Sequence, residues 1–401
     1  MATPHDSGSV PATRTATRFA TAAGCAAAVA FVALTVAASA GLAPGKAPGE
    51  VWYGDYTDAR GLASWLIASM SEPQFYAAAS ASAGLLLGGL LAHVAQKSSR
   101  RWAGFVQACG SGIWPSVVSS ALASLVLGVL AWGWTLEPGL WQPLFVTLVS
   151  TTPAMVVLYG PAPRVWLTAA ISGALLTPPA SILAIDFVCT PMNLPPVVGA
   201  TTGMWVGAAA AFLICGRLPW MPEPGAWRAA HPSAPPAGTG TTVTSPAWVL
   251  RRALADFSEA QFFGNEWASA AMIGGAVIAY VVSPSALVHG SGLFLAVLAS
   301  QVVTALAGVL IWRRQWRELG FYPTFVPVVS VAPAVVLTFG GTPQSVIAGA
   351  LAGALAGPPL AAAISRRLPV GFHPFVGNVA SMSICTALLV PLLHFIPGIA
   401  S

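Results

Sequence analysis

The stretch LFVTLVSTTPAMVVLYGP, residues 144–161, occurs in a second form as TFVPVVSVAPAVVLTFGG, residues 324–341. The two stretches share Phe, Ser, Pro and Gly at the same positions, and the match extends over residues 110–180 and 290–360 at a constant offset of 180 positions. About 25 of some 70 aligned positions are identical, single and paired prolines among them. A shared apolar composition would not place prolines in register, so we infer an internal duplication.

Composition identifies a lipid bilayer as the solvent of this chain. Only 7% of the 401 residues are charged, 56% are hydrophobic, and the mean hydropathy is +0.75, too apolar for a water-exposed surface of ordinary size. Apolar stretches of about 16 to 22 residues recur eleven times, and as helices they are long enough to cross a bilayer core of roughly 30 Å. They lie at residues 19–40, 75–95, 113–134, 144–159, 165–185, 196–215, 263–282, 293–312, 322–339, 345–364 and 375–396. The sequence therefore predicts an all-α polytopic membrane protein with about 11 transmembrane helices, one N-terminal helix followed by two five-helix repeats.

The positions of Lys and Arg predict the orientation of these helices. Cytoplasmic loops retain cations, and with a cytoplasmic N-terminus fifteen of the seventeen Lys and Arg fall on that side. Because each copy has an odd number of helices, the second copy enters the bilayer from the opposite side. The charges agree: cations follow the first and third helices of the first copy (Lys97, Arg164) but the second and fourth helices of the second copy (Arg313, Arg366). We predict inverted-topology repeats in the plasma (inner) membrane, with a cytoplasmic N-terminus and an extracytoplasmic C-terminus.

Shorter matches set the limits of the copies. Residues 71–75 (SEPQF) match residues 258–262 (SEAQF), and residues 196–199 match residues 374–377. The predicted parts are a cytoplasmic tail with a signal-anchor helix (1–42), an extracytoplasmic loop (43–70), the first membrane repeat (71–217), a cytoplasmic Pro/Ala/Gly-rich linker without helical periodicity (218–257) and the second, inverted repeat (258–401). The first apolar stretch is either an uncleaved anchor or a signal peptide cleaved after Ala38-Ser39-Ala40.

Inverted repeats can adopt similar inward-facing and outward-facing states, which is the geometric basis of alternating access. We therefore predict a transporter that moves a small neutral, zwitterionic or apolar solute across the lipid bilayer, with gradient coupling as an option. A passive channel, or a non-transport membrane enzyme or assembly factor, is the alternative. Clustered acidic or His residues, metal-ligand spacing of Cys and His, and a phosphate-binding G-x-x-x-x-G-K motif are all missing from the sequence, so we predict no enzyme, cofactor, metal or nucleic-acid partner.

Prolines inside the third and fourth predicted helices of each copy mark the candidate solute site. Proline removes a backbone donor and frees the carbonyl four residues earlier, so these helices should be kinked or broken within the membrane. The candidate substrate-binding residues are these prolines, the hydroxyls near them and one amide in the last helix: Ser150, Thr151, Pro153, Thr177, Pro178, Pro179, Ser330, Pro333, Pro358, Pro359 and Asn378. The alternative is that the prolines only bend helices and the hydroxyls bond their own backbone.

Three carboxylates are candidate coupling or gate residues. Glu266 falls about one turn inside a predicted span, where a carboxylate is costly and is a functional candidate by default. Its shallow position also suits a residue that reaches the membrane interface. Glu72 and Glu259 recur at the entrances of the two copies, either as symmetric gate residues or as helix-start carboxylates favoured by the helix dipole.

Overall fold

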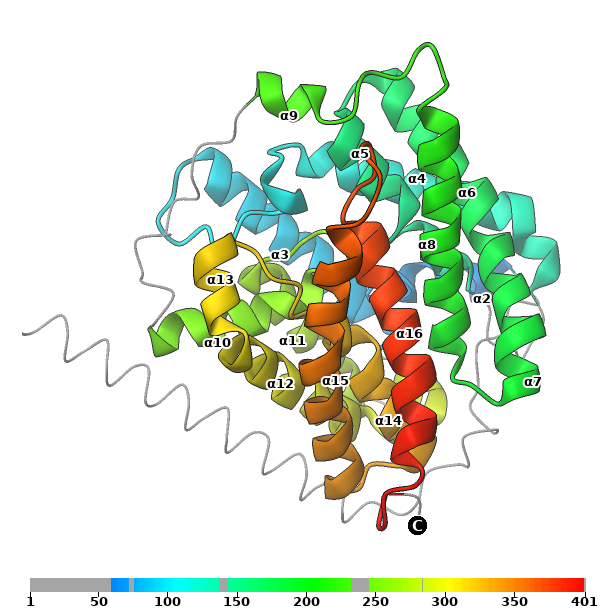
Figure 1. Cartoon of the computed structure of the whole chain (residues 1–401), viewed down its shortest axis with the longest axis vertical. Helices are drawn as coiled ribbons and strands as arrows, with labels where there is room; N and C mark the ends of the chain where they lie inside the picture. Colours follow the sequence, from blue (N-terminus) through cyan, green and yellow to red (C-terminus); the bar gives the residue numbers. More distant parts are fainter. Residues whose placement is uncertain (1–58, 72–75, 137–142, 232–244, 283, 400–401) are drawn as a thin grey trace, which may run out of the picture.

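The computed structural model describes residues 59–71, 76–136, 143–231, 245–282 and 284–399, and all regular structure in these residues is helical (Figure 1). Seven helices are long and apolar enough to cross a bilayer. They are α3 (Ala79–Lys97), α4 (Trp114–Trp132), α6 (Pro163–Ala184), α8 (Pro196–Cys215), α12 (Phe294–Ile311), α15 (Pro343–Ser365) and α16 (Phe375–Leu393). The prediction of a helical membrane protein is confirmed.

Three shorter apolar segments lie where the sequence predicts the remaining spans of the two copies. They are the pair η4 (Leu144–Thr147) and α5 (Thr151–Tyr159), the helix α11 (Glu266–Val282), and the pair η8 (Val326–Val329) and α14 (Val331–Phe339). The predicted span at residues 19–40 and its possible cleavage lie outside the described residues.

Short helices connect these segments, and one of them corrects a prediction. Residues 246–255 belong to the predicted linker without helical periodicity, yet they form α10 (Pro246–Ala255). The Ser245 side chain caps this helix by accepting from Trp248 N, Pro246 occupies the first turn, and Trp248 and Val249 are buried. The other short elements are α2 (Ala59–Ala68), η2 (Ala108–Gly110), η3 (Gly133–Thr135), η5 (Ile185–Cys189), α7 (Thr190–Met192), α9 (Ala226–Ala230), η6 (Asp256–Ser258), η7 (Pro284–Gly290) and α13 (Arg313–Leu319).

We call the parts of the structure that correspond to the predicted repeats, 71–217 and 258–401, the first and second halves. The third segment of each half is broken, as predicted, but the break precedes the proline. Ser150 has φ −130° and ψ −108°, and its equivalent Ser330 has φ −142° and ψ −87°, so the chain leaves helical geometry at both residues. The helices α5 and α14 start at the next residue. Pro153 and Pro333 thus lie in the first turn, where a backbone N–H has no helical acceptor and its loss costs little.

The fourth helix of each half continues through its proline pair, and a tryptophan bonds the carbonyl that the first proline of each pair frees. Proline leaves the carbonyl four residues earlier without its helical donor. In α6 this carbonyl belongs to Ala174, and Trp132 Nε1 of α4 donates to it at 3.0 Å. In α15 the carbonyl of Ala354 accepts from Trp312 Nε1 at 2.7 Å. At the first proline of each pair the indole replaces the missing bond. Both helices run through Pro178, Pro179, Pro358 and Pro359, so the expected breaks are absent there.

Helices α3 and α11, the first of each half, cross with their backbones in contact. A Cβ added to Gly88 would lie 2.6 Å from Trp267 O, and one added to Gly275 would lie 2.1 Å from Ser80 O. Gly88 and Gly275 are equivalent positions of the two copies, as are Ser80 and Trp267. Residue numbers rise along α3 as they fall along α11, so the helices run antiparallel and each contributes the same contact.

Helices α8 and α16, the last of each half, are also antiparallel neighbours. Ser383 Oγ in α16 donates to Thr201 Oγ1 near the start of α8 at 2.9 Å. Phe212 near the end of α8 lies 5.5 Å, between ring centroids, from Phe372, which precedes α16. The two halves therefore pack against each other through α3 with α11 and through α8 with α16.

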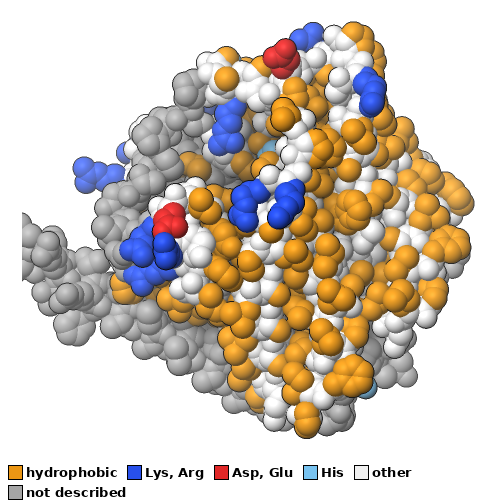
Figure 2. All heavy atoms as spheres, viewed as in Figure 1, with side chains coloured by type: hydrophobic (Ala, Val, Ile, Leu, Met, Phe, Trp, Pro, Cys, Tyr) orange, Lys and Arg blue, Asp and Glu red, His pale blue; other side chains and the backbone are white. Residues whose placement is uncertain are grey.

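Connections that carry most of the Lys and Arg meet at one end of the helices. Ala108 N, after α3, donates to Phe262 O, before α11, at 2.9 Å, and Gly225 N, after α8, donates to Leu158 O, at the end of α5, at 2.9 Å. Figure 2 shows that blue Lys and Arg side chains gather on the upper and left parts of one face, whereas hydrophobic side chains cover α15, α16 and α8 below. We call this part of the molecule the cation-rich end.

Candidate functional site

A cavity of about 640 Å³ lies between the two halves, within the range of about 300–1,000 Å³ that is typical of small-molecule sites. Most of its wall is apolar, and Thr201 and Asn378 add neutral polar groups. Equivalent positions of the two copies line it in pairs: Phe145 and Phe325, Val149 and Val329, Met204 and Met382. Because both halves form the wall, a motion of one half against the other would change the shape of the cavity.

The charged residues of the cavity wall lie at the cation-rich end. They are Arg228 in α9, Arg252 in α10, Glu259 after η6 and Arg317 in α13. His373, between α15 and α16, joins them and is buried. The cavity thus has an apolar body and one charged mouth.

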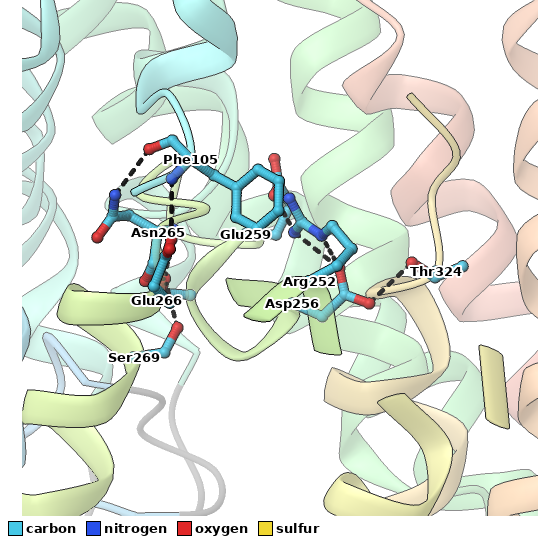
Figure 3. Close-up of polar contacts among 9 residues, drawn as sticks. Phe105, Arg252, Asp256, Glu259, Asn265, Glu266, Ser269 and Thr324 are labelled. Atoms are coloured by element: carbon cyan, nitrogen blue, oxygen red, sulfur yellow. Dashed lines mark hydrogen bonds and ion pairs between the residues drawn. The ribbon is translucent and has the colours of Figure 1, made fainter. Parts of the chain in front are cut away.

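Arg252 is the centre of a buried ionic cluster, which we define as Arg252, Asp256, Glu259 and Thr324 (Figure 3). Its Nε and Nη2 donate to Asp256 Oδ1 at 3.2 and 2.8 Å, and Nη2 also donates to Glu259 Oε2 at 2.6 Å. Thr324 Oγ1 donates to the other oxygen of Asp256 at 2.7 Å. Arg252 and Asp256 are almost fully buried, so their charges are compensated within the cluster, as buried charges must be.

Two aromatic rings flank the same guanidinium group. Arg252 Cζ lies 4.9 Å from the centre of the Phe105 ring and 5.0 Å from that of Trp316, distances at which a cation is attracted to a ring face. Phe105 follows α3 in the first half, Trp316 belongs to α13 in the second, and both line the cavity. Arg252 therefore connects the two halves at the mouth of the cavity.

Burial raises the pKa of Asp256 to about 6, and the positive charge of Arg252 opposes this rise. At pH 7 the carboxylate is ionised and bound to Arg252. Protonation near pH 6 would remove one of the two negative charges that hold the guanidinium, so mild acid weakens the cluster.

Glu266, predicted as a coupling or gate residue, is the first residue of α11 and is buried. Its Oε1 accepts from Arg251 Nη2 at 2.6 Å, and its Oε2 accepts from Phe105 N at 2.8 Å. The neighbouring Asn265 Nδ2 donates to Ala103 O at 3.0 Å and to Phe105 O at 2.7 Å. These side chains fasten residues 103–105 of the first half to the start of α11 (Figure 3).

The other predicted site residues are distributed unevenly about the cavity. Asn378 and Glu259 line it, whereas the predicted hydroxyls and prolines are not among its lining residues. Ser150 and Ser330 are buried and donate to the carbonyls of Val146 and Val326 in their own segments, the bonding that the structural alternative describes. Thr151 and Thr177 are brought together at 2.9 Å between their hydroxyl oxygens. Pro153 lines a second, smaller pocket, and Glu72 lies outside the described residues.

Arg252, Asp256 and Thr324 are site residues that the sequence analysis did not single out. The spacing of Arg252 and Asp256 by four positions, with Glu259 three further on, was a readable signal of ion pairing on one helical face. Arg252 and Asp256 fall in the segment predicted as a linker (218–257), for which no helix was predicted. Thr324 is 68 positions from Asp256, and no local pattern connects them.

Within the described ranges, no group of three or more His, Cys, Asp or Glu side chains is placed to hold a metal ion. Comparison with known proteins found no matching protein-family model, no matching curated protein and no matching solved structure. The structure defines the class, a helical membrane protein with a cavity between two halves, and its functional interpretation depends on that cavity.

Proposed function

We propose that this chain is a membrane transporter in which two inverted five-helix repeats give a small solute alternating access to the central cavity. The observation that carries the proposal is the lining of the cavity by equivalent residues of the two copies. A site built in this way lies close to a pseudo-two-fold axis, so exchanging the conformations of the two halves would present the same wall to the opposite side of the membrane. The antiparallel contacts of α3 with α11 and of α8 with α16 support the same arrangement.

Under this proposal the structure corresponds to the inward-facing state. The cavity is lined by connections of the cation-rich end, which the distribution of Lys and Arg predicts to face the cytoplasm. Away from that end, a separate apolar cluster joins the start of α8 to the far end of α16 through Val197, Val390 and Leu393. Dispersion of this cluster would open the outer side, so it is the proposed outer gate.

The apolar wall favours the apolar class among the predicted solutes. Polar solutes require placed hydrogen-bond partners when they leave water, and the deep wall offers few, Thr201 and Asn378 among them. Transport, not catalysis, is favoured because the acidic groups of the mouth are held in ion pairs and are not presented together to a bound molecule.

A pair of substitutions on one helix tests the proposal. Met204 lines the cavity from α8, whereas Leu213 lies on the same helix and is 52% exposed. Metabolite profiles of deletion and overexpression strains identify the solute, and its flux is then measured in liposomes. We expect Met204→Trp to abolish the flux by filling the cavity and Leu213→Trp to leave it unchanged.

Flux through a carrier saturates and shows counterflow, which a passive channel does not. A non-saturating flux would favour the channel alternative, and turnover of the solute in detergent would favour an enzyme. Full activity of a well-folded Met204→Trp protein would contradict the assignment of the cavity as the solute site.

A further inference from the structure

The charge at the mouth of the cavity is unbalanced. Three arginines line it, and Glu259 is the carboxylate among the described lining residues. Arg252 already bonds both Glu259 and Asp256. Arg228 and Arg317 therefore lack an acidic partner: the described ion pairs include neither, and the side chain of Arg228 donates to the backbone carbonyl of Cys109 at 2.5 Å.

His373 adds an uncharged donor to the same mouth. Burial, with the nearby charge of Arg228 as a second cause, lowers the pKa of His373 to about 4, so its ring is neutral at pH 7. Its Nδ1 accepts from Phe375 N at 3.1 Å, which leaves the proton of the neutral ring on Nε2. The mouth therefore offers two guanidinium groups and an imidazole N–H, and its one carboxylate is already bound to Arg252.

We propose that the cavity binds an amphipathic anion, with a carboxylate or phosphate head group held by Arg228 and Arg317 and a hydrocarbon body against the apolar wall. Guanidinium groups form strong, directional hydrogen bonds with both kinds of head group. A cationic or zwitterionic head would place its ammonium group among arginines without a free carboxylate to receive it. The inference rests on the proposed function and changes the expected solute from an apolar molecule to one with an anionic head group, because the sequence alone could not place these cations at the cavity.

The alternative role for these arginines is to anchor the cation-rich end at lipid head groups. Arg314 provides a matched control for it. It lies on α13 with Arg317, is exposed, and pairs with Glu318 at 2.7 Å, but it does not line the cavity. A surface role would make Arg314 and Arg317 equivalent, whereas a head-group site would not.

The experiment measures equilibrium binding of radiolabelled dodecyl phosphate to the full chain in a neutral maltoside detergent. Unlabelled dodecyltrimethylammonium and dodecanol serve as competitors with the same hydrocarbon body. We expect saturable binding that neither competitor displaces at equal concentration. Arg228→Gln and Arg317→Gln should each weaken it about tenfold, the effect of one lost charge-assisted hydrogen bond, and Arg314→Gln should change it less than twofold. Unchanged gel-filtration profiles and melting temperatures verify that the variants are folded.

Equal displacement by dodecanol, or equal effects of Arg314→Gln and Arg317→Gln, would overturn the head-group assignment. Absence of saturable binding would overturn it too. Solute flux distinguishes failure of the head-group assignment from failure of the transporter proposal. If Met204→Trp blocks the flux while Arg228→Gln and Arg317→Gln leave it unchanged, the transporter proposal is retained and the solute belongs to another class.

Discussion

The crossing of α3 and α11 allows a stability prediction with two adjacent glycines of one helix. Gly275 faces α3, and a Cβ built on it would lie 2.1 Å from Ser80 O and 2.5 Å from Ser80 C. Gly274 is exposed, and a Cβ built there meets no atom within 4 Å. The substitutions Gly275→Ala and Gly274→Ala therefore add the same methyl group to neighbouring positions, one against backbone and one facing outward.

The magnitude follows from the contacts. Alanine in place of glycine stabilises a helix interior by about 0.5–1 kcal/mol, which is the whole expected effect at Gly274. At Gly275 ordinary contact starts near 3.4 Å, so the helices must separate by more than about 1 Å, and such overpacking costs about 1–3 kcal/mol. The separation also strains the 2.7 Å bond from Ser80 Oγ to Gly275 O, which contributes about 0.5–1.5 kcal/mol. We expect Gly275→Ala to be less stable than Gly274→Ala by about 2–4 kcal/mol.

The assay is thermal unfolding of the purified variants in one detergent, with Gly88→Ala as a third member. A Cβ on Gly88 would lie 2.6 Å from Trp267 O, a softer contact than that at Gly275. We expect the melting temperature to fall in the order Gly274→Ala, Gly88→Ala, Gly275→Ala, by several degrees overall. Equal melting temperatures for Gly274→Ala and Gly275→Ala would refute the close crossing of these helices, and with it one of the two antiparallel contacts that support the pseudo-two-fold arrangement.

Four further outcomes are expected. Reporter fusions after Ala162 and after its equivalent Thr342 should report opposite sides of the membrane, and the same side for both would contradict inverted topology. Arg252→Met should destabilise the protein by about 3–5 kcal/mol in chemical or thermal unfolding at pH 8, because it leaves buried carboxylates unpaired; a loss below about 1 kcal/mol would contradict the central role of this cluster. Burial raises the pKa of Asp256 from 3.8 to about 6, so the folded state binds this proton more tightly than the unfolded chain does. Stability should therefore fall as pH rises from about 4 to 6. Asp256→Asn should remove that fall, which a pH series of melting temperatures measures. Glu266→Gln should lower stability by about 1–3 kcal/mol through weakened charge-assisted bonds, whereas loss of the pH dependence of flux without a change in melting temperature would support a coupling role.

The sequence was most informative where one physical rule decides the structure. Among the described residues, seven long apolar helices and three shorter apolar segments lie where the length and hydropathy of the sequence predict them, because membrane helices must satisfy their backbone internally. The rule for prolines worked less uniformly. It predicted the break beside Pro153, but at Pro178 the outcome depended on Trp132, which lies 42 positions from the carbonyl it bonds. The position of a proline in the sequence shows which carbonyl loses its helical donor, and only the fold shows which group donates to that carbonyl instead.

The candidate site was harder to predict because its polar groups come from a segment with the composition of a linker. The Pro- and Ala-rich stretch before α10 concealed an amphipathic helix that buries Trp248 and Arg252. The cavity itself is formed by apolar residues such as Met204 and Met382, which no local pattern distinguishes from residues that face lipid. Their equivalence was visible in the duplication, yet the space between them is a property of how the halves pack.

The polar contacts between the halves gather on one side of the cavity. Residues 102–105, after α3, are bonded to the start of α11 through Asn265, Glu266 and the indole of Trp267, which donates to Trp102 O at 2.6 Å. On the other side, α8 and α16 are joined by the hydroxyl pair Thr201 and Ser383 amid apolar contacts. A rotation that pivots at the start of α11 and separates α8 from α16 therefore breaks few hydrogen bonds. Since α8 and α16 carry cavity residues from opposite halves, this rotation would also change the shape of the cavity, as the proposed alternating access requires. Under the proposed transport function, Glu266 at the start of α11 would belong to the pivot of this motion.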